Sequence, residues 1–418
     1  MTATASAPTL TINLQTARRA AIAALVLLVF LEVFISRVGG VPARAVLDVT
    51  VVFAAALIGA EAFVRQRISP LHLILFINIA LFTFLSLLGA LQDSVFASLV
   101  SAVIFSKFLI VLFLAPSLRL QDLRPAMYAL ATFHFIGSAA NLIFPAFFHA
   151  YLPDVSHQID TSRLMGFSFN ANRAATVSTV LLLYFLFIQR RLALVALFFG
   201  MVVLSGSRSL TLIASLIAGF LILQSQISYT KRLLGSVAAA LIGGLLLTYM
   251  LVSDDMVQTI TNTLYGELRY IRAAMLAGGY YLANEFFPLG VGGGQFGSSL
   301  SAGSDAYRMV GIAHWSTVIN MSGVYDSGIG AILGEYGWLG LGLYIVIVFF
   351  AFRHAHRSAV PFIYAAFFCA LVLTMSLFRT VASDFFYSFF FLFCYVLALE
   401  RRAMILDRRQ QDVNRTTS

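Results

Sequence analysis

Seven arginines are the residues of this sequence best suited to bind an anion. All of them fall on the side of the predicted membrane segments where positive charge is disfavoured. Any one of them could anchor a helix end at the membrane boundary or be solvated in a loop. As a set they favour a cavity that binds an anion, because guanidinium groups match phosphate oxygens in pairs. They are Arg163, Arg173, Arg208, Arg269, Arg272, Arg308 and Arg379.

Two short polar links hold three of these arginines close to the membrane boundary. Arg163 and Arg173 flank one polar break, and Arg208 lies in the very short link Ser205-Gly-Ser-Arg-Ser209 between two apolar segments. A phosphate carried by a lipid lies at the same depth. These positions therefore predict recognition of a lipid-borne phosphate.

Asp326, His314 and Glu335 are candidates for the general base of a transfer reaction. Asp326 immediately precedes a predicted helix, so capping of that helix is an equal alternative. His314 follows a stretch rich in Gly and Ser, where an ordinary loop histidine is the simpler interpretation. Glu335 lies two turns into the helix after Asp326, among glycines spaced for close helix packing. These glycines are Gly330, Gly334, Gly337 and Gly340.

Lys107 lies near the middle of a predicted span. A charge there costs about 2.5–3.5 kcal/mol on insertion scales, so it should be paired or line a cavity. Its possible partners are Glu32, Asp48 and Glu61. A structural ion pair and a functional role are equally good interpretations.

Two familiar kinds of site are not expected. Gly292-Gly-Gly-Gln-Phe-Gly297 matches a dinucleotide pattern, but that pattern requires a preceding strand, and here a helix and Pro288 come first. We expect a flexible turn instead. No group of His, Cys and Asp has metal-binding spacing, so we predict no metal and no other cofactor. Cys369 and Cys394 both fall inside apolar segments and form no disulfide framework.

The composition is that of a membrane protein. Of the 418 residues, 60% are hydrophobic and only 11% are charged, whereas soluble domains carry about 25% charged residues. A water-soluble chain of this composition would have too little polar surface. The net charge of +9 is spread in small clusters between apolar runs, which argues against a nucleic-acid partner.

The apolar runs predict about 12 transmembrane helices in an all-α polytopic fold. Basic links on one side of them hold 17 of the 27 lysines and arginines, nine lie on the other side, and Lys107 lies within a span. Because positive residues are retained in the cytoplasm, both termini should be cytoplasmic. The spans lie near 20–36, 45–64, 71–91, 95–115, 126–148, 171–189, 192–205, 209–227, 232–252, 327–352, 358–378 and 383–399.

These spans divide the chain into three parts. Residues 1–252 form an N-terminal bundle of about nine helices, and residues 253–326 form one large periplasmic loop. Residues 327–418 add three helices and a basic cytoplasmic tail. Apolar residues from Val257 to Met275 recur at helical spacing, so the loop should contain an amphipathic helix that ends by Pro288 and lies on the membrane or packs on the bundle.

Three blocks in this order resemble the O-antigen polymerase and ligase family of bacterial envelope glycan enzymes. The first runs from Arg163 to Ala174, and the second from Leu204 to Ser209. The third joins Tyr270-Ile-Arg272, Phe287-Pro-Leu-Gly-Val-Gly-Gly-Gly-Gln-Phe296, Tyr325-Asp-Ser327 and Leu333-Gly-Glu-Tyr-Gly-Trp-Leu-Gly-Leu341. Family ligases usually carry His-Asn where this chain has Tyr325-Asp326, so the chain looks more like the exopolysaccharide polymerase branch.

The resemblance implies a GT-C-like, metal-independent glycosyltransferase of the bacterial inner membrane. It would join undecaprenyl-pyrophosphate-linked oligosaccharide repeats into exopolysaccharide or O-antigen at the periplasmic face, with membrane lipid and other polysaccharide-assembly proteins as partners. Arg163, Arg173, Arg208 and Arg272 would bind the diphosphate, and Asp326 would be the first choice of base, ahead of His314 and Glu335. The alternatives are ligase-type transfer to another acceptor and a lipid-linked glycan flippase.

Overall fold

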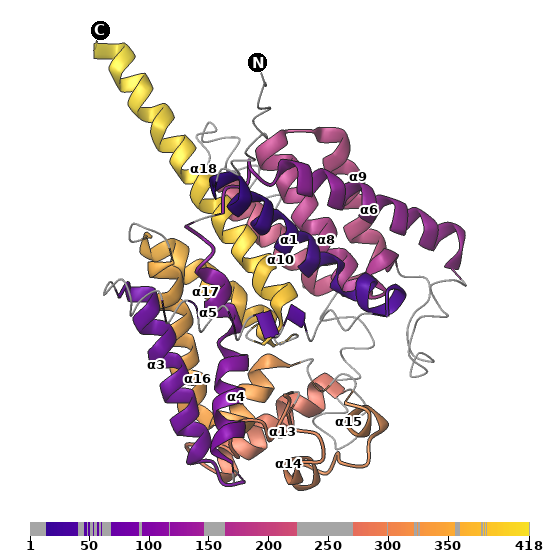
Figure 1. Cartoon of the computed structure of the whole chain (residues 1–418), viewed down its shortest axis with the longest axis vertical. Helices are drawn as coiled ribbons and strands as arrows, with labels where there is room; N and C mark the ends of the chain where they lie inside the picture. Colours follow the sequence, from indigo (N-terminus) through magenta and orange to yellow (C-terminus); the bar gives the residue numbers. More distant parts are fainter. Residues whose placement is uncertain are drawn as a thin grey trace, which may run out of the picture.

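The structure is a computed structural model that describes most of the chain as helices (Figure 1). Within the described residues no strand occurs. The residues described are 14–40, 46–47, 49–50, 53, 57, 60, 68–91, 94–116, 118–145, 164–223, 271–298, 300–321, 324, 327–355, 360–377, 379, 381 and 383–417.

The helices follow the apolar runs of the sequence, and several of them begin at capping residues. Ser69 caps α3 with Pro70 in the first turn, and Ser94 caps the next helix. In chain order the elements are α1 (Leu14–Val38), α3 (Pro70–Leu87), α4 (Val95–Phe105), α5 (Lys107–Leu112), α6 (Arg124–Ile143), the 3₁₀ turn η2 (Gly166–Ser168), α8 (Ala171–Tyr184), the π-turn η3 (Phe185–Gln189), α9 (Leu192–Leu204), α10 (Arg208–Leu223), α13 (Ile271–Glu285), α14 (Asp305–Met309), α15 (Ser316–Ile319), α16 (Gly328–His354), α17 (Phe362–Ser376) and α18 (Phe385–Thr417).

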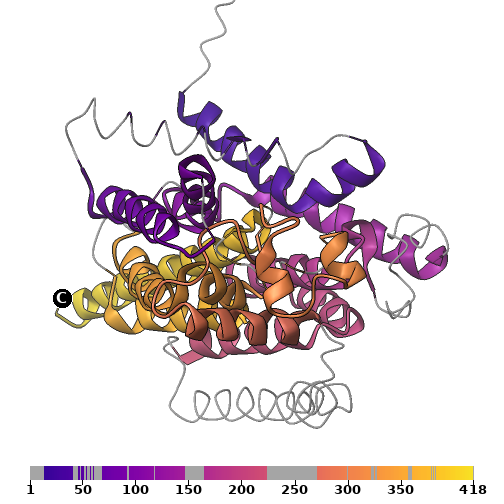
Figure 2. The ribbon, with the colours of Figure 1, turned by 90° about the horizontal axis from the view of Figure 1, so that it is seen from below.

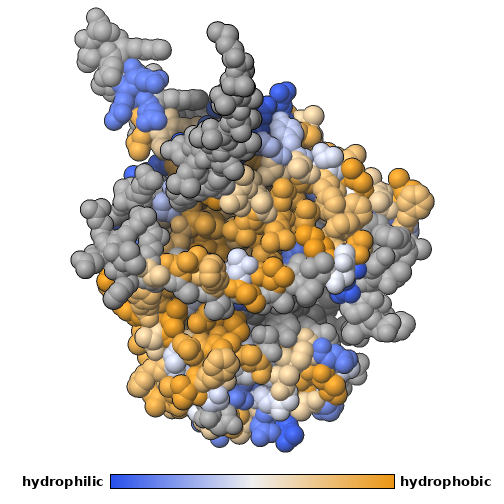
Figure 3. All heavy atoms as spheres, in the orientation of Figure 1, coloured by the Kyte–Doolittle hydropathy of each residue, from blue (hydrophilic) through white to orange (hydrophobic). Residues whose placement is uncertain are grey.

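Five of the described helical stretches are long and apolar enough to cross a membrane. They are Ala20–Val38, Pro70–Leu87, Arg124–Ile143, Ala171–Gln189 and Gly328–His354. Large apolar side chains also face outward, since Phe96 is 76% and Leu192 75% exposed. Figure 3 shows apolar side chains over most of one face, with hydrophilic ones gathered near its upper and lower ends. Such a surface suits lipid as the solvent.

Two groups of helices meet along α18. In Figure 1, α1, α6, α8, α9 and α10 lie together on one side, and α3, α4, α13 and α16 on the other. One hydrophobic core joins the groups, and its largest buried side chains include Phe82, Phe185, Tyr336 and Phe368.

The described part of the predicted large loop is folded. This part, residues 271–298, 300–321 and 324, forms a second hydrophobic core around Met275, Phe296 and Tyr307. Viewed from below, this segment lies across the lower end of the molecule (Figure 2). Of the segment predicted as an amphipathic helix, the structure describes the part from Ile271, which is α13; this helix ends at Glu285 and packs closely on α16. The predicted apolar positions between 257 and 268 lie outside the described residues.

Two predicted continuous spans are interrupted, which corrects the sequence prediction. The span 95–115 consists of α4 and α5, separated at Ser106, and α16 has a non-helical residue at Gly337. Buried polar contacts stabilise both breaks, as shown below for Gly337. The predicted span 232–252 and most of 45–64 lie outside the described residues.

Three of the predicted basic links gather at one end of the described bundle. Arg401 lies over the ring of Phe187, next to the 190–191 link, and Arg402 lies over Tyr364 at the start of α17. The backbone N–H of Leu120 donates to the carboxylate of Glu400 at 2.8 Å. The links at 119–124, 190–191 and 401–402 therefore share one end, as the charge pattern predicts.

Candidate functional site

Arg173 lies in the first turn of α8 and is held by two carboxylates from distant parts of the chain. Its Nη1 atom donates to Glu32 of α1, and its Nη2 atom lies 3.5 Å from Oδ2 of Asp384. Its guanidinium carbon lies 4.9 Å from the ring centroid of Phe386. The three side chains are 9–16% exposed. We call Glu32, Arg173 and Asp384 the arginine junction.

The first turns of α8 and α10 are joined by the two polar links of the sequence analysis. The hydroxyl of Ser207 donates to Oδ1 of Asn172 at 2.8 Å, and the backbone N–H of Leu164 donates to the carbonyl of Leu204 at 3.1 Å. Asn170 caps α8, because its side-chain oxygen accepts from the N–H groups of Asn172 and Arg173. Links that are about 35 residues apart in sequence thus form one surface.

Two further helices begin beside this surface. α18 begins after Asp384, whose Oδ1 atom accepts from the N–H of Phe386 at 2.8 Å. α16 begins after Ser327, and the N–H of Gly328 donates to the carbonyl of the buried Arg379 at 3.2 Å. The contacts described above thus connect the first turns of α10, α8 and α18. The chain segment that contains Arg379 links this group to the first turn of α16. Helix N-termini carry partial positive charge and unpaired N–H groups, which favour an anion.

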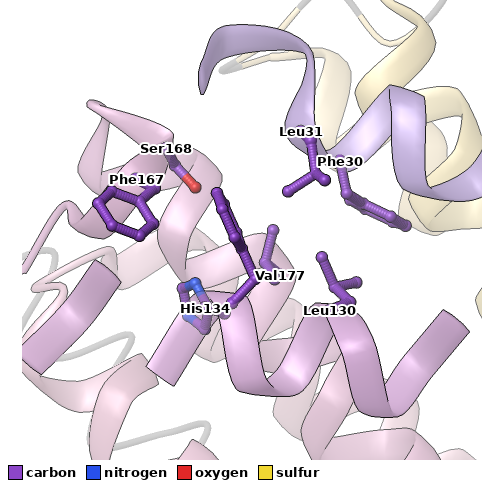
Figure 4. A pocket seen from close by; sticks show the side chains of 8 residues that line it. Phe30, Leu31, Leu130, His134, Phe167, Ser168 and Val177 are labelled. Atoms are coloured by element: carbon purple, nitrogen blue, oxygen red, sulfur yellow. The ribbon is translucent and has the colours of Figure 1, made fainter. Parts of the chain in front are cut away.

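A small cavity lies between residues of α1, α6, η2 and α8 (Figure 4), and Phe30 and Leu31 of its lining directly precede Glu32 in the chain. Its polar groups are His134 and Ser168, and Nε2 of His134 lies 2.7 Å from the hydroxyl of Ser178. The cavity has room for about one water molecule, so it does not hold a sugar. Its lining residues are Phe30, Leu31, Leu130, Phe133, His134, Phe167, Ser168 and Val177.

The glycine-rich segment 288–297 fills the break in α16. The N–H groups of Val291 and Gly292 donate to the carbonyls of Gly334 and Glu335, each at 2.9 Å. Gly337, with φ of 64°, turns the chain at this point. The break in α16 leaves backbone carbonyls without helical partners, and N–H groups of the inserted segment donate hydrogen bonds to them. A membrane requires such pairing, because no water is present there to replace it.

Glu335 is a fully buried carboxylate surrounded by neutral donors. Its Oε1 atom accepts from the N–H of Phe296 and its Oε2 atom from the hydroxyl of Ser101, both at 3.2 Å. Ser101 also lies 2.7 Å from the hydroxyl of Tyr336. We call this network, together with Gly293, the glutamate hub, because it joins α4, α16 and the inserted segment.

The expectation of a flexible turn at Gly292–Gly297 is wrong. A Cβ atom added to Gly293 would approach the hydroxyls of Ser86, Tyr336 and Ser101 within 2.7–2.9 Å. One added to Gly334 would collide with the ring of Phe296. Glycine is needed at both positions because side-chain hydroxyls and an aromatic ring approach the backbone more closely than a Cβ atom permits.

The predicted site residues are distributed unevenly. Arg173 is in the arginine junction, and Arg208 begins α10 beside it. Arg272 is half-buried in the first turn of α13. Glu335 lies in the glutamate hub, inside the protein, and His314 is exposed between α14 and α15. Arg163, Arg269, Asp326 and the side chain of Arg208 lie outside the described residues.

One alternative from the sequence can be decided, the cap of α16. The cap of α16 is Ser327, whose hydroxyl accepts from the N–H of Gly330 at 3.1 Å, so capping by Asp326 is wrong. Lys107 lies with its Nζ atom 5.6 Å from the ring centroid of Phe385, and Glu32 is paired with Arg173. Asp48 and Glu61 lie outside the described residues.

Sequence reasoning missed the partners of the candidate arginines. Asp384 was not singled out, although a carboxylate directly before an apolar helix is a capping signal. Asn172 and Ser207 stood inside the motifs but received no role. Asn141, which accepts from the N–H of Met165 at 2.7 Å, carried no signal at all.

Comparison with known proteins gave no match among family models, curated proteins or solved structures. The chemistry of this region therefore has to be inferred from its own geometry. Within the described residues no group of three or more metal-ligating side chains occurs. The region offers helix N-termini, arginines and nearby carboxylates, which can hold a phosphate group and orient a hydroxyl.

Proposed function

We propose that this protein is a membrane-embedded polysaccharide polymerase that uses a lipid-pyrophosphate-linked oligosaccharide as donor. The single observation that carries the proposal is the contact between Ser207 and Asn172, which brings the first turns of α8 and α10 together. This contact joins the two polar links that carry arginines. They lie at the end of the bundle opposite the basic links at 119–124, 190–191 and 401–402. A diphosphate held there has its lipid tail beside the apolar helices.

The arginines divide into two roles. Arg173 already contacts Glu32 and Asp384, so it acts by fixing the first turn of α8. Arg208, Arg163 and Arg272 are the residues proposed to bind the diphosphate, since a guanidinium fork matches its oxygens. Charge on the departing diphosphate is stabilised by these groups and by the N-termini of the helices.

Asp326 is proposed as the general base. It precedes α16 but leaves the capping of that helix to Ser327. In the reaction the acceptor hydroxyl oxygen attacks the anomeric carbon of the donor sugar, and the bond from that carbon to the phosphate oxygen breaks. The hydroxyl proton passes to Asp326, and the lipid diphosphate leaves with the bonding electron pair.

The topology proposed for this function has 12 spans, a GT-C-like arrangement and both termini in the cytoplasm. It is supported by the basic links that share one end of the bundle. Both the folded segment 271–321 and the first turns of α8, α10, α16 and α18 would then face the periplasm. Reporter fusions at residues 230 and 355 should read cytoplasmic, and fusions at 160 and 300 should read periplasmic.

The test uses purified full-length protein with lipid-linked repeats and a metal chelator. We expect chain growth by the natural protein, and loss of most of it in Arg208→Lys and Asp326→Asn at unchanged protein level, because lysine lacks the paired fork. Arg308→Lys, an exposed residue paired with Asp305, is the control. Full activity in both test variants would refute these site assignments. Transfer to a separate acceptor without chain growth would indicate a ligase, and lipid translocation without transfer a flippase.

A further inference from the structure

Arg190 and Arg401 lie near each other at the end of the bundle that holds the basic links, between the end of α8 and the start of α9. Arg190 follows the π-turn η3 in a left-handed conformation, with φ of 55°, and is exposed. Arg401, in α18, lies with its guanidinium carbon 4.4 Å from the ring centroid of Phe187. Burial and the neighbouring Arg190 both lower the pKa of Arg401. The two positive charges therefore repel each other in a partly desolvated place.

No carboxylate in the described chain forms an ion pair with this arginine pair. Within the same described residues, no group accepts a hydrogen bond from the buried Nε atom of Arg401. Glu400 is next in sequence, but it accepts from the N–H of Leu120. The C-terminal end of α8 attracts the positive charges without satisfying that donor. An anion held between these arginines would offset the repulsion and accept from that donor.

The surroundings identify the kind of anion. Arg191 is exposed beside Arg190, and Arg402 lies over the ring of Tyr364 at 5.7 Å, so four arginines share this end. Exposed apolar residues lie close to them in the chain: Leu192, next to Arg191, is 75% exposed, and Ile363, next to the Tyr364 ring that Arg402 covers, is 63% exposed. A cationic group directly above exposed apolar side chains matches a molecule with a phosphate head and hydrocarbon tails.

We propose that Arg190 and Arg401, with Arg191 and Arg402, form a binding site for the headgroup phosphate of an anionic phospholipid. The phosphate lies between the two repelling guanidinium groups, and the acyl chains lie along the apolar helix ends. This site is separate from the arginine junction, which lies at the opposite end of α8. The proposal does not depend on the transfer reaction.

The experiment measures lipid retention by the full-length protein in non-ionic detergent, using native mass spectrometry and the thermal unfolding midpoint. The probes are phosphatidylglycerol, phosphatidylcholine with the same acyl chains, and inorganic phosphate. We expect phosphatidylglycerol to be retained in preference to phosphatidylcholine and to raise the midpoint. Its binding should weaken about fivefold for each arginine neutralised.

The variants are Arg190→Asn, which tolerates the left-handed conformation, and Arg401→Gln. Because Arg190 is exposed, its replacement leaves the packing intact and remains informative even if Arg401→Gln fails to fold. Arg401→Lys should keep most of the binding, and Arg308→Gln at the other end should keep all of it. Equal retention of the two lipids, or unchanged retention in Arg190→Asn, would overturn the proposal. Stabilisation by inorganic phosphate equal to that by the lipid would overturn the assignment to a phospholipid.

Discussion

The arginine junction and the glutamate hub are both buried polar centres, yet they hold a carboxylate in opposite ways. In the junction, Glu32 and Asp384 share one guanidinium group. In the hub, Glu335 accepts hydrogen bonds from the N–H of Phe296 and the hydroxyl of Ser101. The first centre is built from opposite charges and the second from neutral donors around one acid.

Because of this difference, the two centres stabilise the fold in different ways. Removal of one partner of a buried ion pair strongly destabilises the folded protein, because the remaining buried charge has no opposite charge beside it. Neutral hydrogen bonds are individually weaker, but their directions fix the backbone that donates them. The junction therefore holds three distant segments together by charge, whereas the hub specifies how the glycine-rich segment enters α16.

The largest effect is expected for Arg173→Ala. Removal of the guanidinium leaves Glu32 and Asp384 buried near each other, so stability should fall by about 3–5 kcal/mol. The measurement is the unfolding midpoint of detergent-purified protein. The triple variant that adds Glu32→Gln and Asp384→Asn should recover part of the loss. No recovery would mean that Arg173 stabilises the fold by packing rather than by charge.

Gly337→Ala should have the next largest effect. Gly337 has φ of 64°, and an added Cβ would collide with the carbonyl of Pro288. The left-handed conformation and the overpacking together should cost about 3 kcal/mol. Gly342→Ala, in the same helix with open space around it, is the matched control and should stabilise by up to about 1 kcal/mol. Equal midpoints for the two variants would show that α16 is not tied to the inserted segment.

Glu335→Gln tests the hub with a neutral side chain of similar size. The new NH2 group replaces the oxygen that faces Ser101, whose hydroxyl must then accept instead of donate, so a loss of about 1–2 kcal/mol is expected. This should be smaller than the loss from Arg173→Gln, because no buried charge is left behind in the hub. A larger loss from Glu335→Gln would mean that the negative charge itself is required there. Thermal midpoints measured side by side decide the order.

The smallest effect is expected at the start of α16. Ser327→Ala removes the hydroxyl that accepts from Gly330 and should cost about 1 kcal/mol. Ser327→Asp should restore the cap, since aspartate accepts the same hydrogen bond. If Ser327→Ala has no effect on the unfolding midpoint, another group caps the helix and the case for a separate role of Asp326 weakens.

Much of the helical framework was predictable because hydropathy is a local property of the chain. The run predicted at 192–205 is α9, Leu192–Leu204, and the one predicted to begin at 71 is α3, which begins at Pro70. The gathering of the basic links at one end also followed from their alternation with apolar runs. These features need no knowledge of which helices are neighbours.

The candidate site was only partly predictable. The sequence singled out Arg173 by its sidedness, but its pairing with Glu32 spans 141 residues and that with Asp384 spans 211. No periodicity encodes such a choice among many carboxylates. Asn170 and Asn172 stood in the predicted motif, yet their roles as helix cap and link to Ser207 depend on how α8 and α10 approach each other.

The sequence by itself determined that this chain is an all-helical membrane protein, because composition and the length of the apolar runs are enough to select lipid as the solvent. It also predicted that the basic links lie on one side. Only the tertiary structure decided that the glycines near Gly293 fill a broken helix, that Ser327 rather than Asp326 caps α16, and that Arg173 is already paired. Each of these depends on the distance between segments remote in sequence. Close approach of backbones and burial of charge are properties of neighbours in space.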